Sequence, residues 1–518
     1  MRKTMTQILA GALQRVEAAA KYGIVKSAKI SRRDRELLVK AGYLKEILMG
    51  WYLLAMPTVK KGESTLWFGA YWDFIGLYLE DRFANDYCLS AESSIEIHLG
   101  TTVIPSQIVI NTAKPIRAIV KFPFATSAVI YPKNLPASQE LVRGVRVMSL
   151  VDALCQIAPA FFANRPRDAE IALRSVKTVS DISRALIEGR YLSAAGRIAG
   201  AYEFLNDSAK ARQILEETRA AGLKVTPVNP FQIAKPFLAA QRQPISPQVG
   251  RIKFLWASLR ADVIAILPPA SGIPPDSALY LEQVDEVYKT DAYNSLSIEG
   301  YKVTPELIAR IRDGQWQPAG NPSDQQQVDT MAAKGYLAAF KTVQSSIRSI
   351  FEGEQPAVVV RRDLQKWYRA LFSPSVAAGL LQSYHLAGYR NAPVYITGSR
   401  HVPPSAAAVV DTMEALFDLC QQEANAAVRA VLGHFIFVYI HPYRDGNGRI
   451  GRFLMNTMLA AGGYPWTVIR VSRKDEYLQA LETASVGGDI RRFAQFIADE
   501  MESSRQAMTA KTGTTSAT

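Results

Sequence analysis

The sequence predicts a mainly α-helical protein of several domains: an N-terminal winged helix-turn-helix, a small α+β region and an all-α second half. The length of 518 residues allows two to four domains with separate cores. Apolar residues recur at helical spacing through most of the second half, whereas the alternating runs typical of strands end near residue 148. Proline-rich stretches at 225–250 and 267–275 indicate breaks between domains.

The composition argues against a membrane-spanning or disulfide-rich class. The chain is 48% hydrophobic and 21% charged, which is ordinary for a soluble globular protein, and no apolar run reaches about 18 residues. Because Arg15 and Glu17 interrupt the N-terminal apolar segment, we expect a cytoplasmic chain without a signal peptide. Cys88, Cys155 and Cys420 stand far apart in apolar contexts, which predicts buried thiols in a reducing compartment.

Positive charge is concentrated at the N-terminus. The net charge is +13, and residues 1–60 contain twelve Lys and Arg against four Asp and Glu. More than half of the excess charge therefore lies in a small part of the chain. Such a patch is compatible with nucleic-acid binding.

Residues 1–58 predict a winged helix-turn-helix domain that binds DNA. Apolar spacing predicts a helix over 4–21, and Ser31 is placed as the N-cap of a second helix over 32–41. Two apolar runs joined at Met49 and Gly50 predict a β-hairpin. The residues that the second helix is expected to bury are Leu37, Leu38 and Val39. The basic residues that it would present to the major groove are Arg32, Arg33, Arg35 and Lys40. A small basic domain that binds protein is the alternative.

Residues 59–230 predict an α+β domain. Helices are expected near Trp67, from Ser90 to His98 and over 165–223, with one small sheet between them. The runs expected to form this sheet are Gln107–Asn111, Ala118–Phe122, Ala128–Tyr131 and Val145–Met148. The stretches GWYLLAMP, LSAESSIEIHLG, VINT and VRVMSLVDAL resemble antitoxins of the AbiEi type from abortive-infection systems. Over about 1–230, this resemblance implies a transcriptional regulator with an N-terminal winged helix.

The most informative stretch is HPYRDGNGRIGR, residues 441–452, between two apolar segments of helical length. Pro442 disfavours the α conformation at His441 and so ends the first helix. Gly446 and Gly448 allow close approach to the backbone. The N-terminus of the following helix offers N–H groups and a positive dipole end to an anion.

Charged side chains complete this stretch. Arg449 and Arg452 lie three residues apart at the start of the second helix, where they suit a polyphosphate. Asp445 is placed for Mg²⁺ rather than for the anion. His441 is the group that titrates near neutral pH. Together these residues are the parts of a nucleotidyl-transfer site.

The stretch resembles the signature of the Fic family, His-Pro-Phe-x-(Asp/Glu)-Gly-Asn-Gly-Arg-x-x-Arg. Tyr443 replaces the usual Phe, and every other specified position matches. The resemblance covers about 250–500 and implies an all-α domain with a β-hairpin flap that transfers AMP from ATP to a Ser, Thr or Tyr hydroxyl of a protein target. It implies His441 as the base and Asp445 as the Mg²⁺ ligand. The nucleotide contacts that it implies are Gly446, Asn447, Gly448, Arg449, Arg452 and Asn456.

A second stretch resembles the helix by which some Fic proteins inhibit themselves, Ser/Thr-x-x-x-Glu-(Gly/Asn). Ser295, Glu299 and Gly300 match it upstream of the motif. A carboxylate paired with Arg452 would occupy the charge that holds the γ-phosphate. The resemblance therefore implies an adenylyltransferase that Glu299 inhibits in the resting state.

Residues 392–404 resemble the Fic flap. The run Val394–Ile396, a turn at Thr397-Gly398-Ser399 and a return at His401 predict a short β-hairpin. An exposed strand edge captures the main chain of a target without reading much of its side-chain sequence. The residues expected to dock the target are Val394, Tyr395, Ile396, Thr397 and Gly398.

The expected domains are the winged helix (1–58), the α+β domain (59–230), a linker with the inhibitory helix (231–303), the catalytic core (304–500) and a disordered tail (501–518). The expected partners are ATP, Mg²⁺, a protein target and DNA, and no membrane. The sequence leaves the oligomeric state open, a homodimer included. Two other functions also fit these residues: a hydrolase that removes AMP with the same site, and a non-enzymatic repressor whose second half senses nucleotide.

Overall fold

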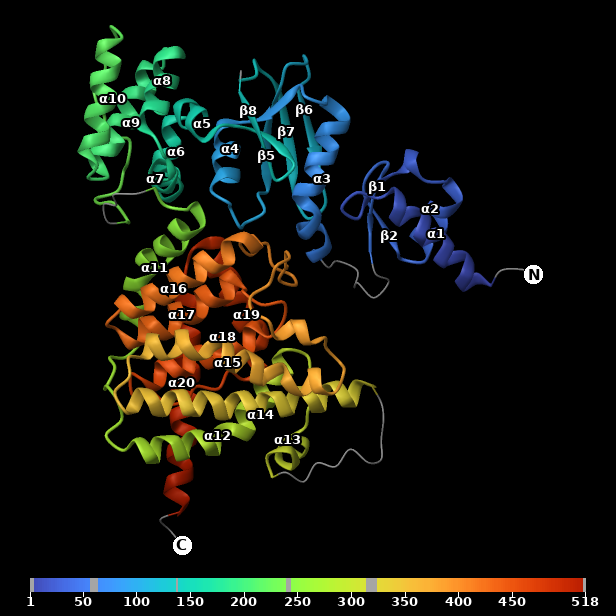
Figure 1. The fold of residues 1–518 in the computed structure, drawn as a ribbon, viewed down its shortest axis with the longest axis vertical. Helices are drawn as coiled ribbons and strands as arrows, with labels where there is room; N and C mark the ends of the chain where they lie inside the picture. The colour runs from blue at the N-terminus through green and yellow to red at the C-terminus, as the bar shows by residue number, and fades with distance from the viewer. Residues whose placement is uncertain (1–3, 56–63, 137, 239–243, 314–323, 516–518) are drawn as a thin grey trace. The chain divides into compact units, whose positions relative to one another are not determined.

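The computed structural model describes residues 4–55, 64–136, 138–238, 244–313 and 324–515, and Figure 1 shows their fold. By their internal contacts these residues form two units. The first unit contains Met1–Pro247 together with Tyr395–Val402, and the second contains Gln248–Val394 and Pro403–Thr518. A short segment from the second half of the sequence therefore belongs to the first unit.

The first unit begins with two helices and a three-stranded antiparallel sheet of order β1-β3-β2. The elements are α1 (Met5–Ala19), β1 (Ile24–Lys26), α2 (Arg32–Lys40), β2 (Leu44–Leu48) and β3 (Trp51–Leu54). The Ser31 side chain caps α2 by accepting the N–H of Asp34. The helices and the hairpin predicted here are present. The predicted burial of Val39 is wrong: its side chain is 44% exposed, because consecutive helical residues cannot all face one core.

The next part of the first unit is a layer of strands with helices. Its elements are α3 (Thr65–Phe83), β4 (Tyr87–Leu89), α4 (Ala91–His98), β5 (Gln107–Thr112), β6 (Ala118–Lys121), β7 (Ser127–Pro132), β8 (Gln139–Val142) and β9 (Val145–Met148). Four strands form a sheet of order β4-β5-β7-β6, in which β5 and β7 are parallel. The aromatic face of α3 packs into the same core as this sheet, with Phe74 and Ile108 fully buried.

The predicted single sheet is wrong in one strand. β9 does not join the other three predicted strands but pairs with β8. Arg143 and Gly144 both have positive φ, so residues 142–145 form a tight two-residue hairpin turn. Alternating sequence identifies a strand, but the turn chemistry decides its partner.

Six helices complete the first unit: α5 (Leu150–Gln156), α6 (Pro159–Asn164), α7 (Pro166–Ser175), α8 (Val179–Glu188), α9 (Leu192–Phe204) and α10 (Ser208–Ala220). In the proline-rich stretch that follows, the described residues 225–238 and 244–246 form no helix or strand, as expected, whereas α11 already includes the last residues of the expected linker, 247–250. Part of it is nevertheless anchored. The buried Glu170 carboxylate accepts the N–H groups of Phe237 and Leu238, and Arg174 donates to the Leu238 carbonyl at 2.9 Å.

The second unit is helical. Its helices are α11 (Pro247–Ile266), α12 (Ser277–Ile298), α13 (Pro305–Arg312), α14 (Asp324–Phe351), α15 (Pro356–Ala377), α16 (Val409–Gln422), α17 (Ala426–Ile440), α18 (Asn447–Ala460), α19 (Lys474–Glu482) and α20 (Arg491–Thr515). The long helices α14 and α15 lie side by side (Figure 1). Short turns of 3₁₀ or π helix occur at Ser27–Lys29, Ser383–Leu386, Ala406–Ala408, Val471–Arg473 and Thr483–Gly487.

The core of the second unit forms around α17 and α18. α17 is apolar on nearly all sides, and Val431, Phe435 and Ile436 are fully buried, as its sequence predicts. The prediction that residues 501–518 form a disordered tail is wrong, because α20 continues to Thr515. Glu502 accepts hydrogen bonds from Arg505 and Gln506, spacings that support a helix.

All three cysteines are buried and unpaired, as expected, and burial raises their pKa values to about 12. Among the described residues, no helix is long and apolar enough to cross a membrane.

Candidate functional site

His441 stands at the end of the buried helix α17, where the sequence places it. It adopts the left-handed conformation, with φ of +53°, and its N–H donates to the Phe437 carbonyl at 2.9 Å. Nδ1 lies 3.2 Å from the Val438 carbonyl oxygen, so Nδ1 carries the proton and Nε2 has a lone pair to accept one. Burial lowers the pKa of His441 to about 4, which keeps the imidazole neutral at pH 7.

Arg390 holds the backbone around His441, a role that was not predicted from the sequence. Its Nε donates to the His441 carbonyl at 2.8 Å, and its other nitrogens donate to the carbonyls of Ala392, Pro404 and Ile440. The side chain is almost fully buried, and burial lowers its pKa to about 10. Nothing in the sequence indicates this contact, because Arg390 is 51 residues away in a stretch without a motif.

The loop after His441 is closed by Asn447. Its side-chain oxygen accepts the N–H of Tyr443 at 2.9 Å, and its side-chain nitrogen donates to the Tyr443 carbonyl at 2.8 Å. The Asn447 side chain therefore organises the loop instead of facing a ligand. The Tyr443 ring stacks on Tyr368 at 3.8 Å, and its hydroxyl donates to Gln365. This partner explains why a buried Tyr is tolerated where the Fic signature has Phe.

The N-terminus of α18 provides an anion-binding geometry. Gly446 is the N-cap with φ of +80°, and a Cβ there would lie 2.7 Å from the Phe372 ring. The first intrahelical bond runs from the Ile450 N–H to the Gly446 carbonyl, so the N–H groups of residues 447–449 come before any intrahelical acceptor.

Asp445 lies beside this helix end. One oxygen accepts the Gly446 N–H at 2.6 Å, and the other lies 3.0 Å from Arg449. Its side chain is 60% exposed. One exposed carboxylate next to a phosphate-binding helix end fits Mg²⁺, which takes most of its ligands from phosphates and water.

Arg449 is fully buried between two rings. Its guanidinium lies 5.0 Å from the Tyr301 ring and 5.1 Å from the Phe372 ring. Its Nε has no hydrogen-bond partner among the described residues. A buried donor of this kind fits an anionic ligand that would satisfy it.

Arg452 is held by the predicted inhibitory helix. Its Nε donates to the Ser295 hydroxyl at 2.9 Å, and a terminal nitrogen donates to the Ser295 carbonyl at 3.0 Å. The same nitrogen lies 2.8 Å from Glu299 Oε1, and Arg452 is only 3% exposed. Ser295, Glu299 and Arg452 are therefore brought together in the arrangement expected from the sequence.

Two glycines set the position of the Glu299 carboxylate. Gly300 has φ of +91° and ends α12, where its N–H bonds to Ser297 and the Tyr301 N–H bonds to Leu296. A Cβ on Gly448 would lie 2.2 Å from Glu299 Oε1. The carboxylate thus occupies space directly over the first turn of α18, where an anion would bind.

Asn456 does not fit its expected role in nucleotide binding. Its side-chain nitrogen donates to the Thr467 carbonyl at 3.1 Å, and its oxygen accepts the Thr467 N–H at 2.7 Å. The side chain is buried, and both of its polar atoms bind the backbone at residue 467. This contact is not visible in the sequence because it depends on the path of the chain after α18.

The flap is not the predicted hairpin. A turn is present at Thr397 and Gly398, but Val394–Ile396 is not a strand. His401 instead forms an antiparallel bridge with Val103. Tyr395, Ile396, Thr397 and Gly398 belong to the first unit, whereas Val394 belongs to the second.

The basic residues of α2 differ in their surroundings. Arg33 and Lys40 are exposed, and Arg32 is exposed but paired with Glu36 at 2.7 Å. Arg35 is partly buried, with its guanidinium 6.0 Å from the Tyr52 ring.

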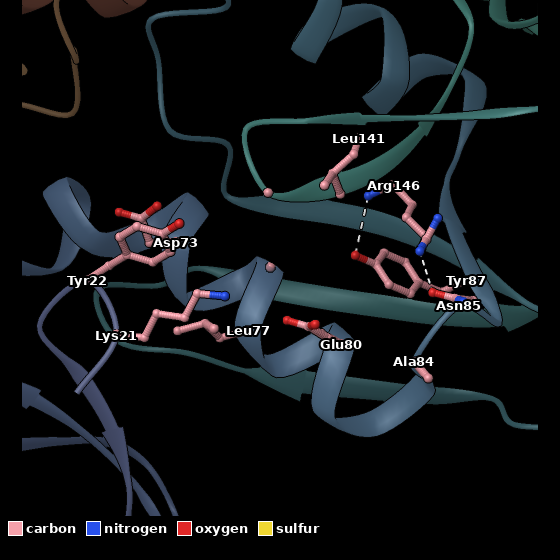
Figure 2. A pocket seen from close by; sticks show the side chains of 12 residues that line it. Lys21, Tyr22, Asp73, Leu77, Glu80, Ala84, Asn85, Tyr87, Leu141 and Arg146 are labelled. Atoms are coloured by element: carbon pink, nitrogen blue, oxygen red, sulfur yellow. Dashed lines mark hydrogen bonds between the residues drawn. The ribbon is translucent and has the colours of Figure 1, made fainter. Parts of the chain in front are cut away.

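The first unit also contains a cavity of about 210 Å³, shown in Figure 2. Lys21 and Arg146 line it together with Asp73 and Glu80, and burial raises the pKa of Asp73. The Tyr87 hydroxyl accepts the Arg146 N–H at 3.3 Å. Because the two cations are matched by two carboxyl groups, this cavity has no preference for a polyphosphate.

Comparison with known proteins identifies the region around His441. Residues 359–459 match the model of the Fic/DOC family. A protein adenylyltransferase Fic from Drosophila willistoni is 29% identical over 218 residues, 41% of this chain and 40% of that protein. The same enzyme from Drosophila grimshawi is 28% identical over 233 residues, 44% of each chain. The chain thus spans less than half the length of these curated relatives.

This chain also aligns with solved structures of Fic proteins. Fic-1 from C. elegans aligns with 68% of this chain and 96% of its own, at 17% identity and a TM-score of 0.38. A Fic domain-containing signalling protein from Bacteroides thetaiotaomicron aligns with 50% of this chain and 97% of its own, at 22% identity and a TM-score of 0.36. From the family match and the curated relatives, this chain contains a Fic/DOC-family domain and is related to the protein adenylyltransferases Fic.

Proposed function

We propose that this protein transfers AMP from ATP to a Ser, Thr or Tyr hydroxyl of a protein target, and that Glu299 inhibits the transfer. The observation that carries the proposal is the Glu299 carboxylate, 2.8 Å from Arg452 and directly over Gly448. A carboxylate in this position stands in for a phosphate oxygen at a helix N-terminus. The relatives named protein adenylyltransferase support the reaction type.

In this proposal His441 acts as the general base. The target hydroxyl oxygen attacks the α-phosphorus of ATP, the bond from that phosphorus to the bridging oxygen of the β-phosphate breaks, and pyrophosphate leaves. The hydroxyl proton passes to Nε2 of His441, because Nδ1 is committed to the Val438 carbonyl. The low pKa of His441 keeps it in the proton-accepting form at neutral pH.

The phosphates would be bound by the first turn of α18. The N–H groups of residues 447–449 and the guanidinium groups of Arg449 and Arg452 provide positive charge where negative charge develops during transfer. Asp445 would hold Mg²⁺, which when bound neutralises phosphate charge and favours departure of pyrophosphate. Tyr301 and Phe372 fix the Arg449 guanidinium in place, so this group does not reorganise during the reaction.

Inhibition follows from competition for one arginine. Glu299 binds Arg452 with a charged hydrogen bond in a largely buried setting. The γ-phosphate of ATP must displace this carboxylate, because the Glu299 carboxylate and a phosphate cannot both occupy the space next to Gly448. The resting protein should therefore bind ATP weakly.

The experiment is labelled ATP added to a cell lysate with purified wild type, Glu299→Gly, His441→Ala and the double variant. We expect Glu299→Gly to raise labelling of proteins, and His441→Ala to abolish it in either background. Glu286→Gly, the same change at an exposed position of α12, is the matched control and should behave as wild type. Equal labelling by wild type and Glu299→Gly would remove the inhibitory role.

The reverse reaction is the second candidate. The Glu299 side chain is 26% exposed, so water can reach a carboxylate that lies beside the phosphate site. Such a carboxylate could position water to hydrolyse the bond between AMP and a modified hydroxyl. Release of AMP from a modified substrate by wild type but not by Glu299→Gly would favour this direction.

We also propose that the N-terminal helices bind DNA. Arg33 and Lys40 are exposed on α2, and the Arg32 side chain is 83% exposed. A gel-shift assay on a fragment of the protein's own promoter tests this. Arg33→Ala should weaken binding and reduce the salt slope by about 0.9 per lost phosphate contact. The exposed Arg212→Ala on α10 is the matched control. DNA binding together with ATP binding but no transfer in Glu299→Gly would indicate a nucleotide-sensing repressor instead.

A further inference from the structure

Arg390 is a buried cation of the second unit that is surrounded by main-chain carbonyl groups. Its side chain is 4% exposed, and its guanidinium nitrogens donate to the carbonyls of His441 at 2.8 Å, Ala392 at 3.1 Å, Ile440 at 3.3 Å and Pro404. Burial alone lowers its pKa, to about 10, and no carboxylate among the described residues pairs with it. A charge buried without a counter-ion is costly, so the position demands a feature that only this side chain supplies.

The feature is a set of donors aimed at the end of α17. Besides the two side-chain bonds to the carbonyls of Ile440 and His441, the Arg390 N–H donates to the Pro442 carbonyl at 2.8 Å. One residue therefore binds three consecutive carbonyl groups at the helix C-terminus, where a positive charge is favoured.

These bonds bracket a strained residue. His441 has φ of +53°, a conformation that a residue with a side chain keeps only where its surroundings hold it. The direction of its Cα–Cβ bond, and with it the place of the ring, depends on this backbone conformation. The ring lies with Nδ1 3.2 Å from the Val438 carbonyl oxygen, which leaves Nε2 to accept a proton. The orientation of the imidazole thus depends on the bonds that Arg390 makes to the backbone.

The charge of Arg390 acts on the same ring. Burial is the largest cause of the low pKa of His441, and the hydrogen bond to Val438 opposes it. Three charged groups also face the imidazole: Arg390 lowers its pKa, whereas Glu299 and Asp445 raise it. Arg390 is therefore the cation that offsets two carboxylates and helps to keep the imidazole neutral.

We propose that Arg390 is a positioning residue for AMP transfer, which fixes the His441 ring in place and keeps its Nε2 free to accept the hydroxyl proton. This inference rests on the proposed function. Arg390 acts through His441 and not through the phosphate site, so its loss should slow transfer without weakening ATP binding. Lysine at this position keeps the positive charge, but its single nitrogen cannot reach four carbonyls as a planar guanidinium does, and methionine loses both properties.

The test compares Arg390→Lys and Arg390→Met in the full-length Glu299→Gly chain. The initial rate of AMP transfer to lysate proteins at saturating ATP should fall by about 10- to 100-fold in both, and the Kd for ATP, measured by calorimetry with Mg²⁺, should not change. Only Arg390→Met should move the acid limb of the pH–rate profile upward from about 4, because it removes the cation that faces His441. Arg492→Met, at an exposed position of α20, is the matched control.

Two outcomes of this comparison would overturn the inference. Equal transfer by Arg390→Met and Arg492→Met would show that the base needs no support from Arg390. A Kd for ATP that rises as far as the rate falls, in both Arg390 variants, would reduce the arginine to a general structural role.

Nitrogen-15 NMR of histidine-labelled protein reads the ring without AMP transfer. The His441 signals, identified by their loss in His441→Ala, should show the proton on Nδ1 alone in the Glu299→Gly parent. In Arg390→Lys the proton should exchange between Nδ1 and Nε2, because the ring is no longer held against Val438. An unchanged tautomer in both Arg390 variants would overturn the inference. Absence of transfer by the parent would instead overturn the proposed function, and the tautomer would still decide whether Arg390 positions the ring.

Discussion

Replacing Glu299 should tighten ATP binding, and the size of the effect can be worked from its contacts. The carboxylate makes one charged hydrogen bond, to Arg452, whose side chain is 3% exposed. When Glu299 leaves, Arg452 keeps its bonds to the hydroxyl and carbonyl of Ser295, so the arginine stays in position. Removing the Glu299 carboxylate therefore makes the Arg452 guanidinium available to ATP, while Ser295 still holds it in position.

A hydrogen bond to a charged group contributes about 1.5–3 kcal/mol, and ATP no longer has to break it in Glu299→Gly. At about 1.4 kcal/mol for each tenfold, the Kd for ATP should fall by about 10- to 100-fold. In Glu299→Gln the side-chain oxygen can still accept a hydrogen bond from the Arg452 guanidinium, but the attraction between two opposite charges is lost. The glutamine variant should therefore lie between wild type and the glycine variant.

Isothermal titration calorimetry with ATP and Mg²⁺ on the full chain measures these affinities. Glu286→Gln, on the exposed side of α12, is the control for a lost charge on the same helix and should match wild type. The order of affinity should be glycine variant, glutamine variant, then wild type and control together. Identical affinities for wild type and Glu299→Gly would refute the argument that the carboxylate and the γ-phosphate compete for Arg452.

The burial of two histidines and the contacts of Asn456 can be tested in the same way. Transfer by Glu299→Gly should persist well below pH 6.5 and fall only near the His441 pKa of about 4, and a pH–rate profile with an acid limb near 6.5 would contradict the role of burial. Burial also lowers the pKa of His434 to about 4, so the unfolded chain binds more protons between about pH 4 and 6.5 and stability should rise with pH in that window; urea unfolding at several pH values should show a shallower slope for His434→Gln. Asn456→Ala should lower the free energy of unfolding by about 1–3 kcal/mol while the Kd for ATP of the Glu299→Gly chain stays unchanged, and a loss of ATP affinity at full stability would restore the nucleotide contact instead.

Local sequence was sufficient for most helices and for the centre of the site. The helical spacing around α17 and the proline after His441 predict where that helix ends, and the glycines predict the sharp start of α18. The resemblance of Ser295, Glu299 and Gly300 to the inhibitory helix of some Fic proteins implies a contact with Arg452, and Glu299 lies 2.8 Å from it. These features are encoded within a few residues, so one sequence reveals them.

Features that depend on distant partners were missed or wrong. The Asn456 side chain was expected to face the nucleotide, but the backbone at Thr467 satisfies both of its polar atoms. The role of Arg390 depends on carbonyls 50 and 51 residues away, which no local pattern reveals. The flap was expected to fold on itself, and it pairs with Val103 about 300 residues earlier instead.

The sequence by itself determined which groups are candidates for the site: a histidine after a buried helix, a glycine-rich helix start, two arginines and the glutamate proposed to be inhibitory. Only the tertiary structure decided which of these groups are available. It commits Asn447 to its own loop, encloses Arg449 between two rings and gives the flap a strand partner. The reason is that hydrogen bonds and ring contacts saturate: a polar atom already paired inside the fold cannot also bind a ligand, and that pairing depends on the path of the whole chain.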